Sequence, residues 1–158
     1  MDIRSFKQDP TKVAEGVVRK FDAEGKVYIR VARQNNPKFE KAMRTALEPY
    51  KNHRKSKIPD KIIEECTKRA MAQTILIEMV GFTDGGGDIT GTKGAKIEDT
   101  EENRYKVLMH KDYGEFVELV STISLDFDTY RAEMDEEQEG KSERPSDGSG
   151  PGAAKKSS

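Results

Sequence analysis

The sequence contains no tryptophan, one cysteine, two histidines and no long apolar run, and each shortage excludes a class of protein. The single cysteine, Cys66, permits no internal disulfide and cannot form a structural zinc site by itself. Crossing a bilayer takes roughly 18–20 consecutive apolar residues, which no segment supplies. The first ten residues also lack the basic and apolar regions of a signal peptide. We therefore expect a soluble protein without an export signal.

Apolar residues are scarce as well, at 34% of the 158 residues against about 45–50% in typical globular chains. The core must therefore be small for the length of the chain. The last twenty residues consist of Gly, Ser, Pro, Ala and charged or polar side chains, which cannot offset the entropy cost of ordering. We predict a single folded domain over residues 1–138 and a disordered tail over residues 139–158.

The net charge of −1 conceals two oppositely charged halves. Residues 1–80 carry 18 Lys or Arg against 11 Asp or Glu, a net +7, and residues 81–158 carry 10 against 18, a net −8. Opposite surfaces attract over a Debye length of about 8–10 Å. This polarity predicts pairing of the halves within one chain or a weak, salt-sensitive homo-oligomer.

An alternating run at residues 27–33 predicts a β-strand with Val27, Ile29 and Val31 on one face. A turn signal at residues 22–25 separates it from a second apolar run at residues 17–21, so the two runs predict a β-hairpin. Two strands alone are marginally stable in water. We therefore expect helices to pack on the apolar face of this hairpin.

Helical patterns follow the hairpin. Asn36 and Pro37 predict a helix start, and apolar residues at spacings of three and four extend the helix to about Tyr50. A second helix is expected over residues 59–80. Its last third, residues 75–80, is apolar nearly all round, so a strand is the alternative for that segment.

The chain from residue 82 to residue 97 is glycine-rich, and we predict a flexible loop there. Helical segments are expected after it at residues 99–109, 112–123 and 127–134, with Asp112 capping the second. The predicted fold class is α+β and mostly helical, an N-terminal β-hairpin packed on a bundle of four to five helices.

The sequence contains no complete motif for catalysis, nucleotide binding or metal binding. Gly86-x4-Gly91 has the glycine spacing of a P-loop, but Lys93 is followed by glycine instead of Ser or Thr and a helix. His53 and His110 lie far apart, and no C-x2-C or H-x3-H spacing occurs. We predict that the protein is not an enzyme and binds no metal or cofactor.

Residues 38–57 contain seven Lys or Arg against two Glu, and Lys38, Lys41 and Arg44 fall on the solvent side of the predicted helix. Such a stretch can contact nucleic-acid phosphates. Its two aromatic residues fall on the apolar stripe, where they are not available to stack on bases. A nucleic-acid-binding regulator therefore remains an alternative, and the three basic residues are candidate partner contacts.

Several short stretches, in one order, resemble segments of phage tail assembly chaperones, and together they cover about residues 12–139. The run IRVARQNNPKF at residues 29–39 is similar to the family's IAR-x-x-N-x-x-F/Y segment. Residues 72–84 resemble its apolar helix running into a G-x-x-D…G loop. Further similar stretches are LEPY at 47–50, DTEEN at 99–103, DYGEFV at 112–117 and LDF at 125–127.

This resemblance implies a non-catalytic assembly factor that acts in the host cytoplasm and is absent from the mature virion. Such proteins bind the long, helical tape measure protein, keep it soluble, and help to recruit the major tail tube protein. The alternatives are the nucleic-acid-binding regulator and a structural head or tail completion protein that stays in the particle. A salt series tests the first alternative and analysis of purified virions tests the second.

The resemblance also leads to a hypothesis about the partner surface. A long helix must hide its apolar stripe, and a helix-in-groove contact is an economical way to cover it. We expect residues 112–134 to form part of that contact, with Tyr113, Phe127 and Tyr130 as partly exposed aromatic anchors. The alternative is that all three side chains close the core.

Overall fold

The computed structural model describes residues 1–54 and 57–132, which divide into two compact units. The smaller unit joins Met1–Asp9 to the described residues from Arg131 onward, and the larger unit is Pro10–Tyr130. The predicted domain end at residue 138 and the predicted disordered tail lie outside the described residues.

The smaller unit begins with a short 3-10 helix, η1 (Ile3–Phe6). The Asp2 side chain caps this helix by accepting a hydrogen bond from the N–H of Arg4 at 2.9 Å. Farther along, the N–H of Ala132 donates to the carbonyl of Lys7 at 2.9 Å and so ties the two segments of the unit together.

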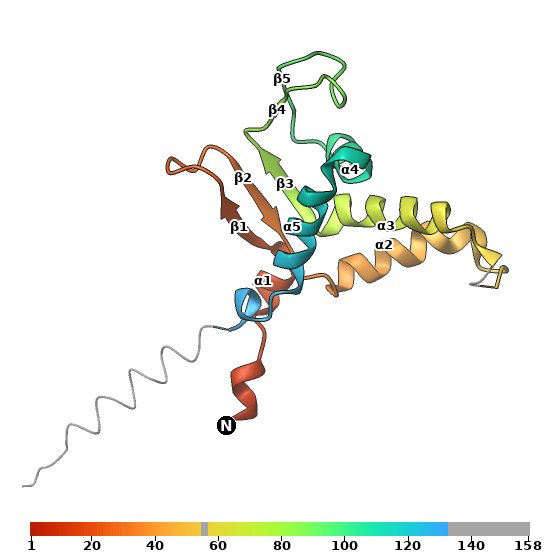
Figure 1. Ribbon diagram of the computed structural model, residues 1–158. Helices are drawn as coiled ribbons and strands as arrows, with labels where there is room; N and C mark the ends of the chain where they lie inside the picture. Colours follow the sequence, from red (N-terminus) through yellow and green to blue (C-terminus); the bar gives the residue numbers. More distant parts are fainter. Residues whose placement is uncertain (55–56, 133–158) are drawn as a thin grey trace, which may run out of the picture. The chain divides into compact units, whose positions relative to one another are not determined.

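The larger unit contains a three-stranded antiparallel sheet in the order β1-β2-β3, with helix α5 (Gly114–Leu125) lying against one face (Figure 1). The hairpin predicted from the alternating pattern is confirmed, and Ile29 and Val31 are completely buried as that pattern predicted. The strands are β1 (Val17–Lys20), β2 (Tyr28–Val31) and β3 (Leu76–Val80), and a short helix, α1 (Pro10–Glu15), precedes them.

The second long helix ends earlier than predicted, and the strand that was the alternative for residues 75–80 is confirmed. That helix, α3 (Asp60–Thr74), stops six residues before Val80, and the next residues form β3. Here the backbone pairs with β2, with Met79 opposite Ile29. An apolar segment is helical or extended according to what its backbone pairs with, which periodicity alone does not reveal.

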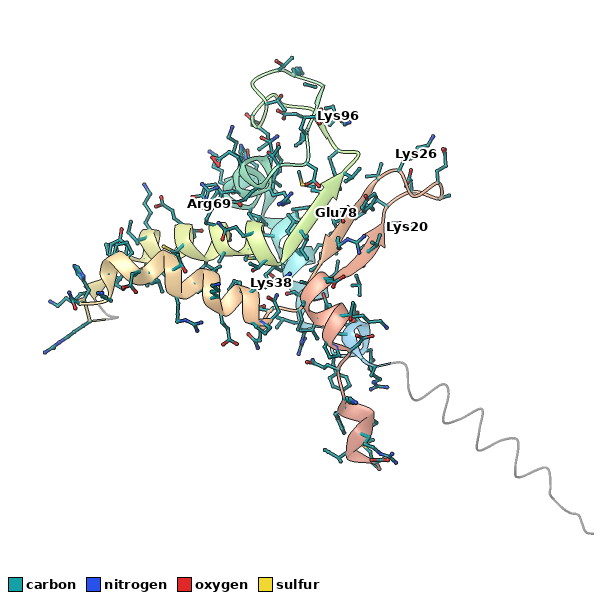
Figure 2. All side chains as sticks on the ribbon, turned by 180° about the vertical axis from the view of Figure 1, so that it is seen from behind. Lys20, Lys26, Lys38, Arg69, Glu78 and Lys96 are labelled. Atoms are coloured by element: carbon teal, nitrogen blue, oxygen red, sulfur yellow. The ribbon has the colours of Figure 1, made fainter. Side chains whose placement is uncertain are left out.

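Contacts of the Glu78 side chain stabilise the extended conformation of β3. The side chain projects from the sheet face that is turned to the viewer in Figure 2. There it accepts a hydrogen bond from the Tyr28 hydroxyl at 2.9 Å and pairs with the Arg30 guanidinium, both on the neighbouring strand. The hydrogen bond from Arg30 is the main cause of a lowered Glu78 pKa.

The first long helix, α2 (Pro37–Leu47), lies beside α3 and continues as the 3-10 helix η2 (Glu48–Tyr50) (Figure 1). Asn36 caps it as predicted by accepting a hydrogen bond from the N–H of Phe39 at 3.0 Å. The Asn36 amide is fully buried and also donates to the carbonyl of Thr74, which ties the start of α2 to the end of α3.

Two further helices complete the unit, α4 (Glu101–Met109) and α5 (Gly114–Leu125), together with the 3-10 helices η4 (Lys111–Tyr113) and η5 (Asp128–Tyr130). Asp112 does not cap α5 as predicted. It lies inside η4, which the His110 side chain caps, and α5 begins two residues later. The core includes Ile29, Val31, Leu76, Met79, Leu108 and Val120.

The predicted fold class is confirmed as α+β, with about half of the described residues helical and small antiparallel sheets. The second sheet is a two-stranded pair, β4 (Thr83–Asp84) with β5 (Ala95–Lys96), at the two ends of the glycine-rich loop. None of the helices within the described residues is both long enough and apolar enough to cross a membrane.

Candidate functional site

The glycine-rich loop is organised around one buried carboxylate, Asp84, which is 1% exposed. Its two oxygens accept five hydrogen bonds of 2.7–3.1 Å, from the backbone N–H groups of residues 87–90 and from the Thr90 hydroxyl. The bond from the Thr90 N–H is the main cause of a lowered Asp84 pKa. The prediction of a flexible connector is therefore wrong, because the loop wraps a carboxylate that satisfies its backbone donors.

An apolar pocket of about 350 Å³ opens between this loop, α4 and α5. That volume lies at the lower end of the range for ligand pockets, so it accommodates one or two side chains or a small molecule. The walls are the side chains of Met79, Phe82, Ile97, Val107, Tyr113 and Phe116, and the backbone of Gly85 and Gly86 forms part of the lining.

Aromatic contacts hold the pocket wall in place. Phe82 makes edge-to-face contacts with Phe21 at a ring separation of 5.6 Å and with Phe116 at 6.0 Å. The three rings come from the hairpin turn, from the loop and from α5. Edge-to-face pairs at such separations are favourable beyond the area they bury, so the wall is formed before any ligand binds.

Polar groups gather beside Tyr113. Its ring stacks on His110 at 4.4 Å, and the His110 Nε2 lies 3.9 Å from a carboxylate oxygen of Asp88. Burial is the main cause of a raised Tyr113 pKa, and the charges of Asp88, Asp84 and Asp112 add to it. The pocket thus combines an apolar interior with a negatively charged neighbourhood, which suits an apolar anchor followed by a neutral or basic group rather than an anion.

The three predicted aromatic anchors do not form one surface. Tyr113 is half-buried and lines the pocket, and Phe127 is half-buried in the segment after α5. Tyr130 is completely buried, and its hydroxyl donates to the Val31 carbonyl at 2.8 Å. Burial raises the Tyr130 pKa. The expectation that Tyr130 is partly exposed is wrong, because its side chain belongs to the core.

The predicted basic residues Lys38, Lys41 and Arg44 are all exposed on α2 (Figure 2 labels Lys38). Lys38 and Lys41 share a groove with Arg69 of α3, whereas Lys41 and Arg44 line a groove near the end of α2. The structure therefore brings the basic residues together, but not with Tyr113.

Residue-by-residue reasoning missed the pocket because its walls come from segments far apart in the sequence. Phe82 and Phe116 have no unusual pattern around them. The available signal was the spacing of Asp84 and Thr90 around three glycines, since Asp and Thr side chains commonly bond backbone groups a few residues ahead.

Metal-binding residues do not gather anywhere in the described part of the chain, where no three His, Cys, Asp or Glu side chains lie close enough to hold an ion. The Asp84 oxygens are occupied by N–H and O–H donors. The absence of a cofactor and of catalytic activity stays a prediction.

Comparison with known protein families gives a match. A family model described as YdaY prophage protein matches residues 34–141, more than half of the chain. That range includes both long helices, β3, the Asp84 loop and all of the pocket walls. No curated protein and no solved structure matches the chain.

Proposed function

The chain belongs to the YdaY prophage protein family, and we propose that it acts as a non-catalytic tail assembly chaperone. In this role it binds the tape measure protein, keeps it soluble, and helps to recruit tail tube subunits during tail assembly. The family shows that the protein is a prophage protein, and the ordered motifs that resemble tail assembly chaperones support this particular role.

The observation that carries the proposal is the preformed apolar pocket between the Asp84 loop, α4 and α5. A tape measure protein is expected to be a long helix with an apolar stripe, and such helices dock by inserting spaced apolar anchors. Gly85 lies in the pocket lining, and a Cβ added there would meet no atom within 4 Å. The lining at Gly85 therefore borders open space.

The size of the pocket suits a protein that binds its partner reversibly. Burying one Leu or Phe side chain contributes about 1.5–3 kcal/mol before the entropy cost of binding is counted. A pocket of about 350 Å³ accepts only one or two such anchors. Each contact is therefore weak enough to be displaced when tube subunits polymerise around the tape measure protein.

Coexpression tests this proposal. The very long helical open reading frame expected beside this gene in the phage genome should be recovered in soluble form only when the chain is coexpressed. A Gly85→Leu variant should fold normally and fail in this assay, because leucine fills the pocket mouth. The matched control is Gly114→Leu at the start of α5, where an added Cβ also meets nothing within 4 Å and which does not line the pocket.

Two outcomes would count against the proposal. If the long partner is equally soluble with and without the chain, the chaperone function is wrong. If Gly85→Leu keeps the partner soluble as well as Gly114→Leu does, the function stands but the pocket is not the docking site. Detection of the chain in purified virions would favour a structural completion protein instead.

A further inference from the structure

The pocket between the Asp84 loop, α4 and α5 carries charge of one sign. Among the residues that line it, only Asp84 has a charged side chain. The groups that bond its carboxylate are neutral N–H and O–H donors. Asp84 forms no ion pair with any residue that the structure describes. The negative charge in the lining therefore has no cation paired with it in that part of the chain.

Asp88 brings a second carboxylate to the edge of the same pocket. A Cβ added to Gly86, which lines the pocket, would lie 2.6 Å from the Asp88 Oδ2 atom. The same oxygen lies 3.9 Å from Nε2 of His110, whose ring stacks on the wall residue Tyr113. The Asp88 side chain is 51% exposed. This carboxylate is therefore held at the rim of the pocket, where an approaching ligand can meet it.

The Tyr113 hydroxyl lies in the field of these carboxylates. Burial is the largest cause of its raised pKa, and the charges of Asp88, Asp84 and Asp112 add to that rise. No described Lys or Arg offsets them, although Lys111 lies only two residues earlier. The hydroxyl makes no hydrogen bond within residues 1–54 and 57–132. Its oxygen is therefore free to accept a hydrogen bond from a cationic N–H group.

We infer that the pocket binds an apolar group with a cation beside it, and that the tape measure protein supplies both from one helix. The apolar group is a leucine or aromatic side chain, and the cation is a Lys or Arg three or four residues away. Residues at that spacing share one face of a helix, so the cation can lie between Asp88 and the Tyr113 hydroxyl. The identity of the partner rests on the proposed function, and the class of ligand is what the inference adds.

Other kinds of anchor fit the pocket less well. An anionic group would approach the carboxylates of Asp84 and Asp88 and would find no cation in the lining. A purely apolar anchor would cover the Tyr113 hydroxyl without giving it a hydrogen-bond partner, which costs free energy. A cation at the exposed rim keeps part of its hydration while it gains a charge-assisted hydrogen bond.

The pocket also has a preferred end for this cation. Lys96 lies opposite the lining residue Thr83 in the β4–β5 pair and is exposed. Its charge is not among those that shift the Tyr113 pKa. A second cation beside β4 would meet Lys96, whereas one beside Tyr113 meets carboxylates. The cation of the ligand therefore belongs at the Tyr113 end.

Two small molecules that share an indole ring separate charge preference from anchor size. Tryptamine carries an ammonium group, and indole-3-propionate carries a carboxylate on a linker of the same length. Each is titrated into the full, methyl-labelled chain at about pH 8, above the usual titration range of histidine. Chemical-shift changes at the pocket residues Ile97 and Val107 locate the binding and give the two dissociation constants.

Tryptamine should bind at least about threefold more tightly than indole-3-propionate at about 50 mM salt, and the preference should shrink at about 500 mM. Asp88→Asn with Asp112→Asn should remove most of the preference, and Asp88→Lys with Asp112→Lys should reverse it. The matched control, Glu40→Gln with Asp60→Asn, removes two exposed carboxylates from α2 and α3 and should keep the preference. Amide NMR spectra recorded first show that every variant is folded.

Several results would overturn the inference. Equal affinities of the two molecules would do so, as would tighter binding of indole-3-propionate to the wild type. Absence of shifts at Ile97 and Val107, or an equal loss of preference in the control pair, would do the same. None of these results involves the tape measure protein, so the coexpression assay decides the proposed function separately. A preference for tryptamine combined with a failed coexpression assay would support the ligand class and overturn the partner.

Discussion

The α2 helix and the glycine-rich loop at residues 82–97 show opposite relations between pattern and burial. The helix has a clear apolar stripe and a confirmed start, yet it contains no fully buried residue. The loop has no periodicity, yet Asp84, Ile89 and Ile97 within it are 1–6% exposed. A regular pattern therefore predicts which element forms, whereas burial depends on whether another part of the chain covers it.

Truncation of one apolar side chain to alanine in each region should show the largest difference in unfolding free energy between them. Ile97→Ala removes a buried side chain that lines the pocket, and we expect a loss of about 2–4 kcal/mol of unfolding free energy. Met43→Ala on α2 should cost about 1 kcal/mol or less, because its side chain is only half-buried. Denaturant unfolding at low protein concentration measures both.

A Met43→Ala cost equal to that of Ile97→Ala would break the contrast. It would mean that the α2 stripe is covered in solution. Repeating the measurement over a concentration series then separates cover by a second copy from cover within one chain, since only the former depends on concentration.

Removing the Asp84 charge should have the next largest effect, and it should be confined to the loop. Asp84→Asn leaves an amide that cannot accept all five hydrogen bonds. We expect the amides of residues 87–90 to exchange at least about tenfold faster, with little change in α2. Hydrogen exchange read out by NMR measures this, and Asp88→Asn is the control, because the exposed Asp88 carboxylate lies in the same loop and accepts none of these five hydrogen bonds.

The same carboxylate gives the loop a pH dependence of known sign. Hydrogen bonding, chiefly from Thr90, lowers the folded-state pKa of Asp84 below its unfolded value of about 3.9. The stabilisation is therefore complete above that value and is lost as the pH falls through the lower folded-state pKa. Asp84→Asn should remove this part of the acid sensitivity. Equal acid sensitivity of the two proteins below pH 4 would contradict the assignment.

Local patterns in the sequence predicted the elements that depend on neighbouring residues. The alternation around Ile29 predicted the hairpin, and Asn36 with Pro37 predicted the start of α2. The boundary at Thr74 was missed because the strand that pairs with β3 lies more than forty residues earlier in the chain. Tyr130 was misplaced for the same reason, since its hydroxyl bonds to Val31 on β2.

The candidate site was less predictable than the fold. Tyr113 was identified from the sequence, but the pocket it lines also needs Phe82 from the loop and Val107 from α4. No local pattern brings these residues together. The loop itself was misjudged because glycine content was taken as a sign of flexibility, whereas glycines also permit the backbone to turn around a carboxylate.

Glycine substitutions in the loop should give a smaller effect that depends on position. Gly87 has φ of 78°, and an added Cβ would lie 3.1 Å from the backbone nitrogen of Lys93. Gly87→Ala should therefore cost about 1–2 kcal/mol, as expected for a side chain forced into the left-handed region. Gly85→Ala meets no atom within 4 Å and should change stability by less than about 0.5 kcal/mol. Equal effects at the two positions would contradict the left-handed backbone and the close approach of Lys93 at Gly87.

The smallest change in unfolding free energy is expected on the exposed face of α2. This change is a gain in stability, whereas the other substitutions are expected to lower stability. Thr45 is exposed within this helix, and its side chain makes no hydrogen bond among the described residues. Thr45→Ala replaces a β-branched residue by the best helix former and should stabilise the protein by a few tenths of a kcal/mol, up to about 0.7. Thermal melting with a dilute sample measures the gain. A loss of stability would mean that the Thr45 methyl or hydroxyl contacts another molecule or another part of the chain. This face of α2 would then be covered, and the contrast between an uncovered regular helix and a covered irregular loop would fail.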